Sequence, residues 1–291
     1  MLFGGEWTEA KSSEWIDVDN PATGEIIDRV PKATKEDVRR VVDVADDARR
    51  TAEETPAFKR ASMLLKVSAL LQEQSDAFAR VISLEAGKPI RDAEVEVRRA
   101  IGVFTFAAEE SKRLYGEVFP TDAYEYPMGS ETRLAFSIRE PVGVVVAIAP
   151  FNFPLNLMAH KVAPALAGGN VVIAKPTSET PLSTIKLGEL IIKAGCPPGV
   201  FNVVTGPGST VGTELIENPK TNFVTFTGST AAGLEIAGKA ARLGKKLTLE
   251  MGGMDPFIVL EDADLNTAAD AAVEDVSVTR DKYALRQSDF L

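Results

Sequence analysis

The first third of the chain carries apolar residues at the spacing of helices. From Thr34 onward an apolar stripe is formed by Val38, Val41, Val42 and Ala45. Thr34 followed three residues later by Asp37 is the sequence signature of a capped helix start. Two more helices are predicted over about 57–85 and 90–114, separated by Gly87-Lys88-Pro89. Their buried stripes comprise Met63, Leu64, Val67, Leu70 and Leu71 in one, and Val97, Ile101, Phe104 and Ala108 in the other.

Residues 1–33 and 115–140 have a different pattern. The first segment predicts short strands and turns, with a turn at Asn20-Pro21-Ala22-Thr23-Gly24-Glu25. The second alternates apolar and polar residues around Pro127-Met128-Gly129-Ser130, which predicts a β-hairpin extending from the body.

From residue 142 the pattern alternates between strands and helices. Short apolar runs predict buried strands at 142–149, 170–174, 200–204, 222–226 and 246–249. Helical patterns between and after them cover 155–166, 182–194, 209–217 and 231–243. This order predicts an α/β fold, with an open parallel Rossmann-like sheet and right-handed connections. In such sheets ligands bind at the carboxyl ends of the strands, so the loops there are the places to look for function.

Composition narrows the class of protein. The chain is 45% hydrophobic and 25% charged, and its net charge of −10 argues against a nucleic-acid partner. No apolar run approaches 18 residues and no secretory signal is recognisable, so we expect neither a membrane span nor export. The single cysteine, Cys196, excludes an internal disulfide and fits a cytoplasmic location. With one cysteine and one histidine, we expect no metal site.

Two strand-end loops carry candidate catalytic groups. In Pro150-Phe151-Asn152-Phe153-Pro154 the Asn152 amide is a fixed donor suited to a developing oxyanion, or else the asparagine caps the following helix. In Glu250-Met251-Gly252-Gly253 a carboxylate ends a buried strand. In an apolar setting its pKa would rise and it could act as a general base, whereas the alternative is an exposed Glu beside hinge glycines.

Three further loops could bind a nucleotide. Lys175-Pro176-Thr177-Ser178-Glu179 can hydrogen-bond a ribose or a 2′-phosphate, or is a solvated turn with Thr180 as helix cap and Pro181 at the first position. The Gly206–Gly212 loop lacks the G-x-G-x-x-G spacing, so a tight turn explains it equally well. In Gly228-Ser229-Thr230-Ala231-Ala232-Gly233, Gly228 allows close backbone approach and Ser229 stands at a helix start suited to pyrophosphate, or is a plain cap.

In order and spacing, these loops resemble the aldehyde dehydrogenase superfamily, from about Gly5 to about Asp264-Leu265 and including Glu85-Ala86-Gly87-Lys88-Pro89. The resemblance implies that family's fold with most of the catalytic domain missing. Residues 1–252 would be the NAD(P)-binding domain, with 115–140 as an oligomerisation arm, and 253–291 the start of the catalytic domain. The full-length form would be a homodimer or homotetramer.

The resemblance also implies roles for residues. Asn152 would form the side-chain half of the oxyanion hole, Glu250 would activate the deacylating water, Lys175 would bind the adenosine ribose and Ser229 the pyrophosphate. The family reaction oxidises an aldehyde to an acid through attack by a cysteine thiolate and hydride transfer to the nicotinamide. The implied cofactor-binding set is Ala149, Pro150, Phe151, Lys175, Thr177, Ser178, Gly208, Gly212, Phe226, Thr227, Gly228, Ser229, Gly233, Glu250, Met251 and Gly252.

One position bears on cofactor and substrate choice. NAD-preferring members usually carry Glu three residues after the loop lysine, where this chain has Ser178. Because the repulsion of a 2′-phosphate is then absent, we expect NADP, or use of both cofactors. Phe151, where many relatives have Trp, is compatible with small hydroxy-aldehydes or semialdehydes as substrates.

The family's nucleophilic segment, Phe-x-Asn-x-Gly-Gln-x-Cys, does not occur in the chain. Cys196 stands in a helix-to-strand loop and is expected to be structural. We therefore expect no aldehyde oxidation by these 291 residues, and the alternative is a non-catalytic nucleotide-binding module. Residues 274–291 are unlike the family. Read one nucleotide out of register, their codons permit Phe-x-Asn-x-Gly-Gln-Val-Cys, with cysteine at position 284, 34 residues after Glu250 (284 − 250). The sequence thus predicts a frameshifted tail over 275–291.

Overall fold

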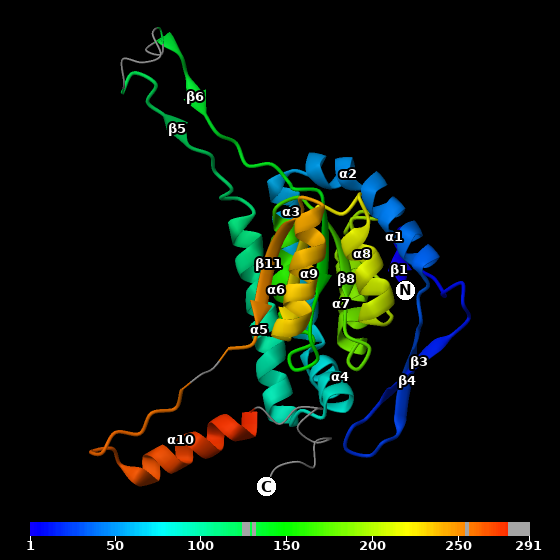
Figure 1. Ribbon diagram of the computed structural model, residues 1–291, viewed down its shortest axis with the longest axis vertical. Coiled ribbons are helices and arrows are strands. Elements are labelled where there is room, and N and C mark those ends of the chain that lie inside the picture. The colour runs from blue at the N-terminus through cyan, green and yellow to red at the C-terminus, as the bar shows by residue number, and fades with distance from the viewer. Residues whose placement is uncertain (124–128, 130–131, 254–255, 279–291) are drawn as a thin grey trace.

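The computed structural model describes residues 1–123, 129, 132–253 and 256–278 (Figure 1). Among these residues the main sheet has the strand order β11-β10-β7-β8-β9-β1-β2. Its parallel strands are β7 (Val144–Ile148), β8 (Val171–Lys175), β9 (Phe201–Val203), β10 (Phe223–Gly228) and β11 (Lys246–Met251). Every strand predicted after residue 142 is therefore present. The parallel α/β fold is confirmed.

The sheet is extended at one edge by strands that the sequence pattern did not assign to it. β1 (Leu2–Phe3) pairs antiparallel with β9 through Leu2 and Val203, and β2 (Glu6–Trp7) pairs with β1. Two-residue strands are too short to show a periodicity. A separate hairpin joins β3 (Trp15–Asp19) to β4 (Ile26–Pro31) through the predicted turn at Asn20.

Helices cover the sheet in two groups. α6 (Asn156–Ala167) and α7 (Leu182–Lys193) pack on the strands, and outside them pack α3 (Ala57–Glu73), α4 (Ser75–Ala86) and α5 (Ile90–Glu110). The other group consists of α1 (Lys35–Asp47), α8 (Thr213–Glu217) and α9 (Thr230–Arg242). In this group α1 packs on β8, α9 packs on β10 and β11, and α8 contacts both α1 and α9. The central strands β7 and β8 are buried along their whole length, as the unbroken apolar runs predict.

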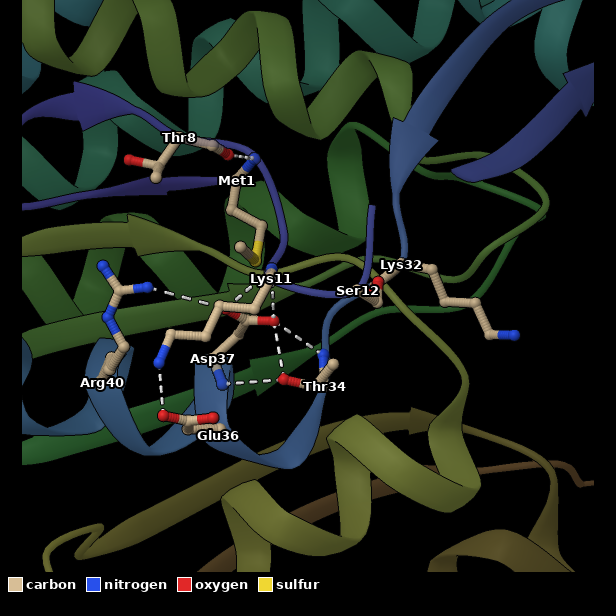
Figure 2. A network of polar contacts seen from close by, with 9 residues as sticks. All are labelled: Met1, Thr8, Lys11, Ser12, Lys32, Thr34, Glu36, Asp37 and Arg40. Carbon is tan, nitrogen blue, oxygen red and sulfur yellow. Dashed lines mark hydrogen bonds and ion pairs between the residues drawn. The ribbon is translucent and has the colours of Figure 1, made fainter. Parts of the chain in front are cut away.

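The predicted start of α1 is confirmed in detail (Figure 2). Asp37 N donates to Thr34 Oγ1 at 3.1 Å, and Thr34 N donates to Asp37 Oδ2 at 3.0 Å, which completes a capping box. The buried Asp37 carboxylate also accepts from Lys11 N at 3.2 and 3.3 Å. One carboxylate thus both starts the helix and ties the preceding loop to it.

Several helix boundaries differ from the prediction. The helix predicted over 57–85 is divided into α3 and α4 at Gln74, whose φ of −109° and ψ of 20° leave the helical region. The apolar stripe continues through this bend, so periodicity could not show it. The helix predicted over 209–217 begins as a π-helical turn, Gly208–Gly212, before α8. α2 (Arg49–Glu54) and α10 (Leu265–Val278) were not predicted, and α5 ends at Glu110 instead of 114.

The arm predicted at 115–140 is a paired hairpin in its described part. β5 (Val118–Phe119) pairs antiparallel with β6 (Ala135–Phe136), and the two strands project away from the sheet (Figure 1). Of the turn predicted at 127–130, only Gly129 lies within the described residues.

The predicted tail lies largely outside the described residues, since 279–291 are not described. Within the described chain, no helix has the length and apolar character needed to cross a membrane.

Candidate functional site

The parallel strands bring the predicted site residues to one edge of the sheet. In register, Ile148 of β7 pairs with Lys175 of β8 and with Phe226 of β10, and Thr227 of β10 pairs with Glu250 of β11. The loops that follow these strands therefore begin at the same level. Most of the predicted catalytic and cofactor-binding residues lie on or just after these strand ends, while Gly208 and Gly212 lie in the turn that follows β9 and Gly233 lies in α9.

The Asn152 loop is held through its backbone. Lys88 Nζ donates to the Asn152 carbonyl at 2.6 Å, and Phe153 N donates to Asn152 Oδ1 at 3.1 Å. The Nδ2 group of Asn152 has no hydrogen-bond partner among the described residues, so it can donate to a ligand. Asn152 does not cap α6. That role belongs to Glu96, whose Oε1 accepts from Leu155 N at 3.0 Å and Asn156 N at 3.1 Å.

Lys88 and Glu96 form a buried ion pair that the sequence analysis missed. Their Nζ and Oε2 atoms are 2.6 Å apart, and the two side chains are 3% and 0% exposed. The Lys88 ammonium also lies 3.6 Å from the centre of the Phe153 ring. In the sequence, Lys88 appears only as part of a family-like turn, and nothing local links it to a loop 64 residues away.

A second buried glutamate, Glu85, caps α7. Its carboxylate accepts from Leu182 N at 2.7 Å and from Ser183 N at 3.0 Å, and burial raises the pKa of Glu85 to about 7. The predicted alternative, with Thr180 as cap, is wrong. The Thr180 hydroxyl is buried and has no partner among the described residues, and Pro181 precedes the helix.

Lys175 is buried at the end of β8. Its Nζ donates to the Pro176 carbonyl at 3.0 Å, and burial lowers the pKa of Lys175 to about 8. Beyond it, the Thr177 hydroxyl bonds the Glu179 carboxylate, and Ser178 is half-buried between them. The lysine and the residue that should select the cofactor are therefore close in the same loop.

The glycines at the site differ in what an added side chain would meet. A Cβ on Gly208 would meet nothing within 4 Å, and one on Gly212 would meet Lys175 Cε and Cδ at the ordinary contact distances of 3.8 and 3.9 Å. In contrast, a Cβ on Gly228 would lie 2.5 Å from the Phe226 ring, and one on Gly233 would lie 2.4 Å from Met251 Sδ. Packing against Phe226 therefore favours glycine at position 228 without any ligand, and the close approach of a ligand there stays a prediction.

Ser229 caps α9 by accepting from Ala232 N at 3.3 Å. The plain-cap interpretation is therefore realised. It does not conflict with pyrophosphate binding, because a single cap leaves other N–H groups of the first turn available.

Glu250 does not have the predicted apolar setting. In the described chain it is exposed on β11, beside the exposed Met251 and Gly252. Another residue that the sequence analysis missed, Lys161 of α6, donates to Thr227 Oγ1 at 2.7 Å, and Thr227 pairs with Glu250 between β10 and β11. Burial lowers the pKa of Lys161 to about 8, and the Glu250 charge acts in the opposite direction. The alternative interpretation, an exposed Glu beside glycines, is the one that the structure has.

Cys196 lies far from this constellation. It precedes β9, at the amino end of a parallel strand, whereas the predicted site lies at the carboxyl ends. The thiol is buried, which raises the pKa of Cys196 to about 12. A thiol with that pKa supplies almost no thiolate near neutral pH. The structural role predicted for Cys196 fits this position.

Residues 7–282 match the aldehyde dehydrogenase family, and the chain belongs to this family. The match continues beyond Asp264-Leu265, where the motifs predicted that the resemblance would end. Among curated proteins, the chain is 41% identical over 278 residues to a lactaldehyde dehydrogenase of Methanocaldococcus jannaschii, covering 94% of this chain and 57% of that protein. It is 42% identical over 272 residues to an NADP(+)-dependent succinate-semialdehyde dehydrogenase of Escherichia coli, covering 94% and 55%.

Solved structures agree with these relatives. A crystal structure described as an E. coli NADP dependent enzyme superimposes with a TM-score of 0.90 at 40% identity, over 96% of this chain and 56% of that one. Betaine aldehyde dehydrogenase of Staphylococcus aureus, in complex with NAD+, gives a TM-score of 0.88 at 32% identity, over 94% and 53%. The chain thus spans about half the length of the relatives it matches.

Proposed function

We propose that the chain is the nucleotide-binding portion of an NAD(P)-dependent aldehyde dehydrogenase, with residues 1–252 as the cofactor domain and 253–291 as the start of a catalytic domain. The buried Lys175 ammonium supports this most directly. It has three donors, yet within the described chain it gives one hydrogen bond, to the carbonyl of the next residue. A buried cation with spare donors beside a strand end fits the hydroxyl or phosphate oxygens of a nucleotide.

Each residue at this edge has a task in the proposed reaction. The cofactor, when bound, accepts a hydride from the substrate. The Asn152 Nδ2 group would donate to the oxygen on which negative charge develops. Glu250 would take a proton from the water that completes the reaction, and its charge interacts with the Lys161 ammonium. The described residues place no thiol at this edge, so the nucleophile of the family reaction is not assigned to them.

NADP is the proposed cofactor, and Ser178 supports that choice. A hydroxyl at this position does not repel a 2′-phosphate, whereas a carboxylate would. The relatives include both kinds, one named for NADP(+) and one solved with NAD+. Their names do not decide the preference of this chain.

A small polar aldehyde is the proposed substrate. A cavity of 720 Å³ lies between α5 and α6, lined by residues that include Arg99, Phe106, Asn156 and His160. Asn156 is the first residue of α6 and lies four residues beyond Asn152, so the cavity reaches the helix start that follows the loop of the proposed oxyanion donor. Two relatives are named for lactaldehyde and succinate semialdehyde, which are small and polar. A homo-oligomer and a cytoplasmic location stay predictions. The frameshift also stays a prediction, and the genomic DNA would test it by showing whether the codons of the nucleophile segment follow one nucleotide out of register.

Titration calorimetry with NADP and NAD tests the proposal. Lys175→Met should weaken NADP binding at least about tenfold, because a charge-assisted hydrogen bond is lost. The matched control is Lys66→Met, which removes the same charge from an exposed position on α3. Ser178→Glu should weaken NADP binding more than NAD binding. Absence of binding of either nucleotide, or equal effects of Lys175→Met and Lys66→Met, would refute the proposal.

A further inference from the structure

The corner between α4 and α5 places buried charges beneath the proposed site. Gly87, with a φ of 73°, ends α4, and Pro89 precedes α5, so the chain reverses within three residues. The residues around this corner include Glu85, Lys88 and Glu96, all 4% exposed or less. Buried charges are costly unless each finds partners, so the partners indicate what the corner holds in place.

The two carboxylate oxygens of Glu96 have different partners. Oε1 accepts from Leu155 N and Asn156 N, the first N–H groups of α6, while Oε2 binds Lys88. A carboxylate at a helix start is also stabilised by the helix dipole. The position of Glu96 therefore fixes where α6 begins, only a few residues after Asn152.

Lys88 holds the Asn152 loop at a second point, so that Lys88 and Glu96 together form a clamp on it. Its ammonium donates to Glu96 and to the Asn152 carbonyl, at 2.6 Å in each case, and packs over the Phe153 ring. The loop is thus held at its middle by Lys88 and at its end by Glu96. No contact from Lys88 or Glu96 reaches the Asn152 amide itself among the described residues, which leaves that group available.

We propose that Lys88 and Glu96 are positioning residues, which hold the Asn152 side chain in the orientation that the proposed oxyanion contact requires. This inference rests on the proposed function for the identity of the ligand, but the clamp can be measured without any ligand. Glu85 offers an internal reference, because it caps the neighbouring helix α7 through Leu182 N and Ser183 N and does not touch the Asn152 loop.

Amide hydrogen exchange at pH 8, followed by nuclear magnetic resonance on the whole chain, tests the clamp. In Glu96→Gln, exchange of the Leu155 and Asn156 amide protons should accelerate about 100-fold, the equivalent of the roughly 3 kcal/mol that breaking a buried ion pair costs. The Leu182 and Ser183 amide protons should keep their rates. Equal acceleration at both helix starts would indicate general destabilisation and overturn the proposal.

The side-chain amide signals of Asn152 report the positioning directly. Their two resonances can be identified as the pair missing from Asn152→Asp. Both Glu96→Gln and Lys88→Met should move this pair toward the position of a freely rotating amide. Unchanged resonances in both variants would overturn the proposal.

NADP and NAD titrations of the unaltered chain, followed in the same spectra, separate the two claims. No response to either nucleotide would remove the proposed function. The exchange rates would still decide whether Lys88 and Glu96 hold the loop.

Discussion

The buried carboxyl of Glu85 makes a testable link between pH and stability. It is fully buried at the start of α7, and burial raises its pKa from an ordinary value of 4.5 to about 7. Between these values the folded chain keeps a proton on Glu85 that the unfolded chain releases. The stabilisation is therefore fully present below pH 4.5 and is lost as pH rises through about 7.

The size of the effect follows from the two pKa values. Between pH 5 and pH 8 the free energy of unfolding should fall by about 2.5 kcal/mol through this group alone. Glu85→Gln removes the titration but keeps the shape and one acceptor. The difference in unfolding free energy between Glu85→Gln and the unaltered chain should therefore rise by about 2.5 kcal/mol from pH 5 to pH 8, whatever its value at pH 5.

Urea unfolding followed by circular dichroism at several pH values measures this difference. The comparison cancels the titration of all other groups, because they are common to both proteins. A difference that stays constant from pH 5 to pH 8 would show that Glu85 has an ordinary pKa in the folded chain. The argument from burial would then be wrong.

Four further predictions concern other parts of the chain. The buried Cys196 should react with a thiol reagent at pH 8 only as fast as the chain unfolds, and rapid reaction of the folded chain would contradict the raised pKa. Phe136 on the arm is 63% exposed, so Phe136→Ser should reduce the self-association that light scattering measures. A monodisperse tetramer at low salt would contradict the expectation that exposed apolar residues of the arm cause aggregation. Gly143→Ala should destabilise the chain by about 2 kcal/mol, because φ is 113° and the new Cβ would lie 2.3 Å from Asn222 Oδ1. Gly238→Ala, in open space on α9, should instead stabilise it by about 0.5 kcal/mol.

The sequence was sufficient where the cause of structure is local. The unbroken apolar runs at 144–148 and 171–174 required strands buried on both faces, and strands alternating with helices required a parallel sheet. Parallel strands put their carboxyl ends on one edge, which is why Asn152, Lys175 and Glu250 could be assigned to one site from their places in the chain. The capping box of Thr34 and Asp37 also lies within four residues and was predicted correctly.

Tertiary structure decided whatever depends on residues that are distant in sequence. Glu96 caps a helix that begins about 60 residues later, and Lys88 holds the carbonyl of Asn152, 64 residues away. Their individual identities carry no signal of these partners. The sequence therefore offered Asn152 as a cap of the following helix, whereas a distant carboxylate performs that task. Exposure is decided in the same way, because the apolar setting expected for Glu250 depends on what packs over β11 and not on the strand itself.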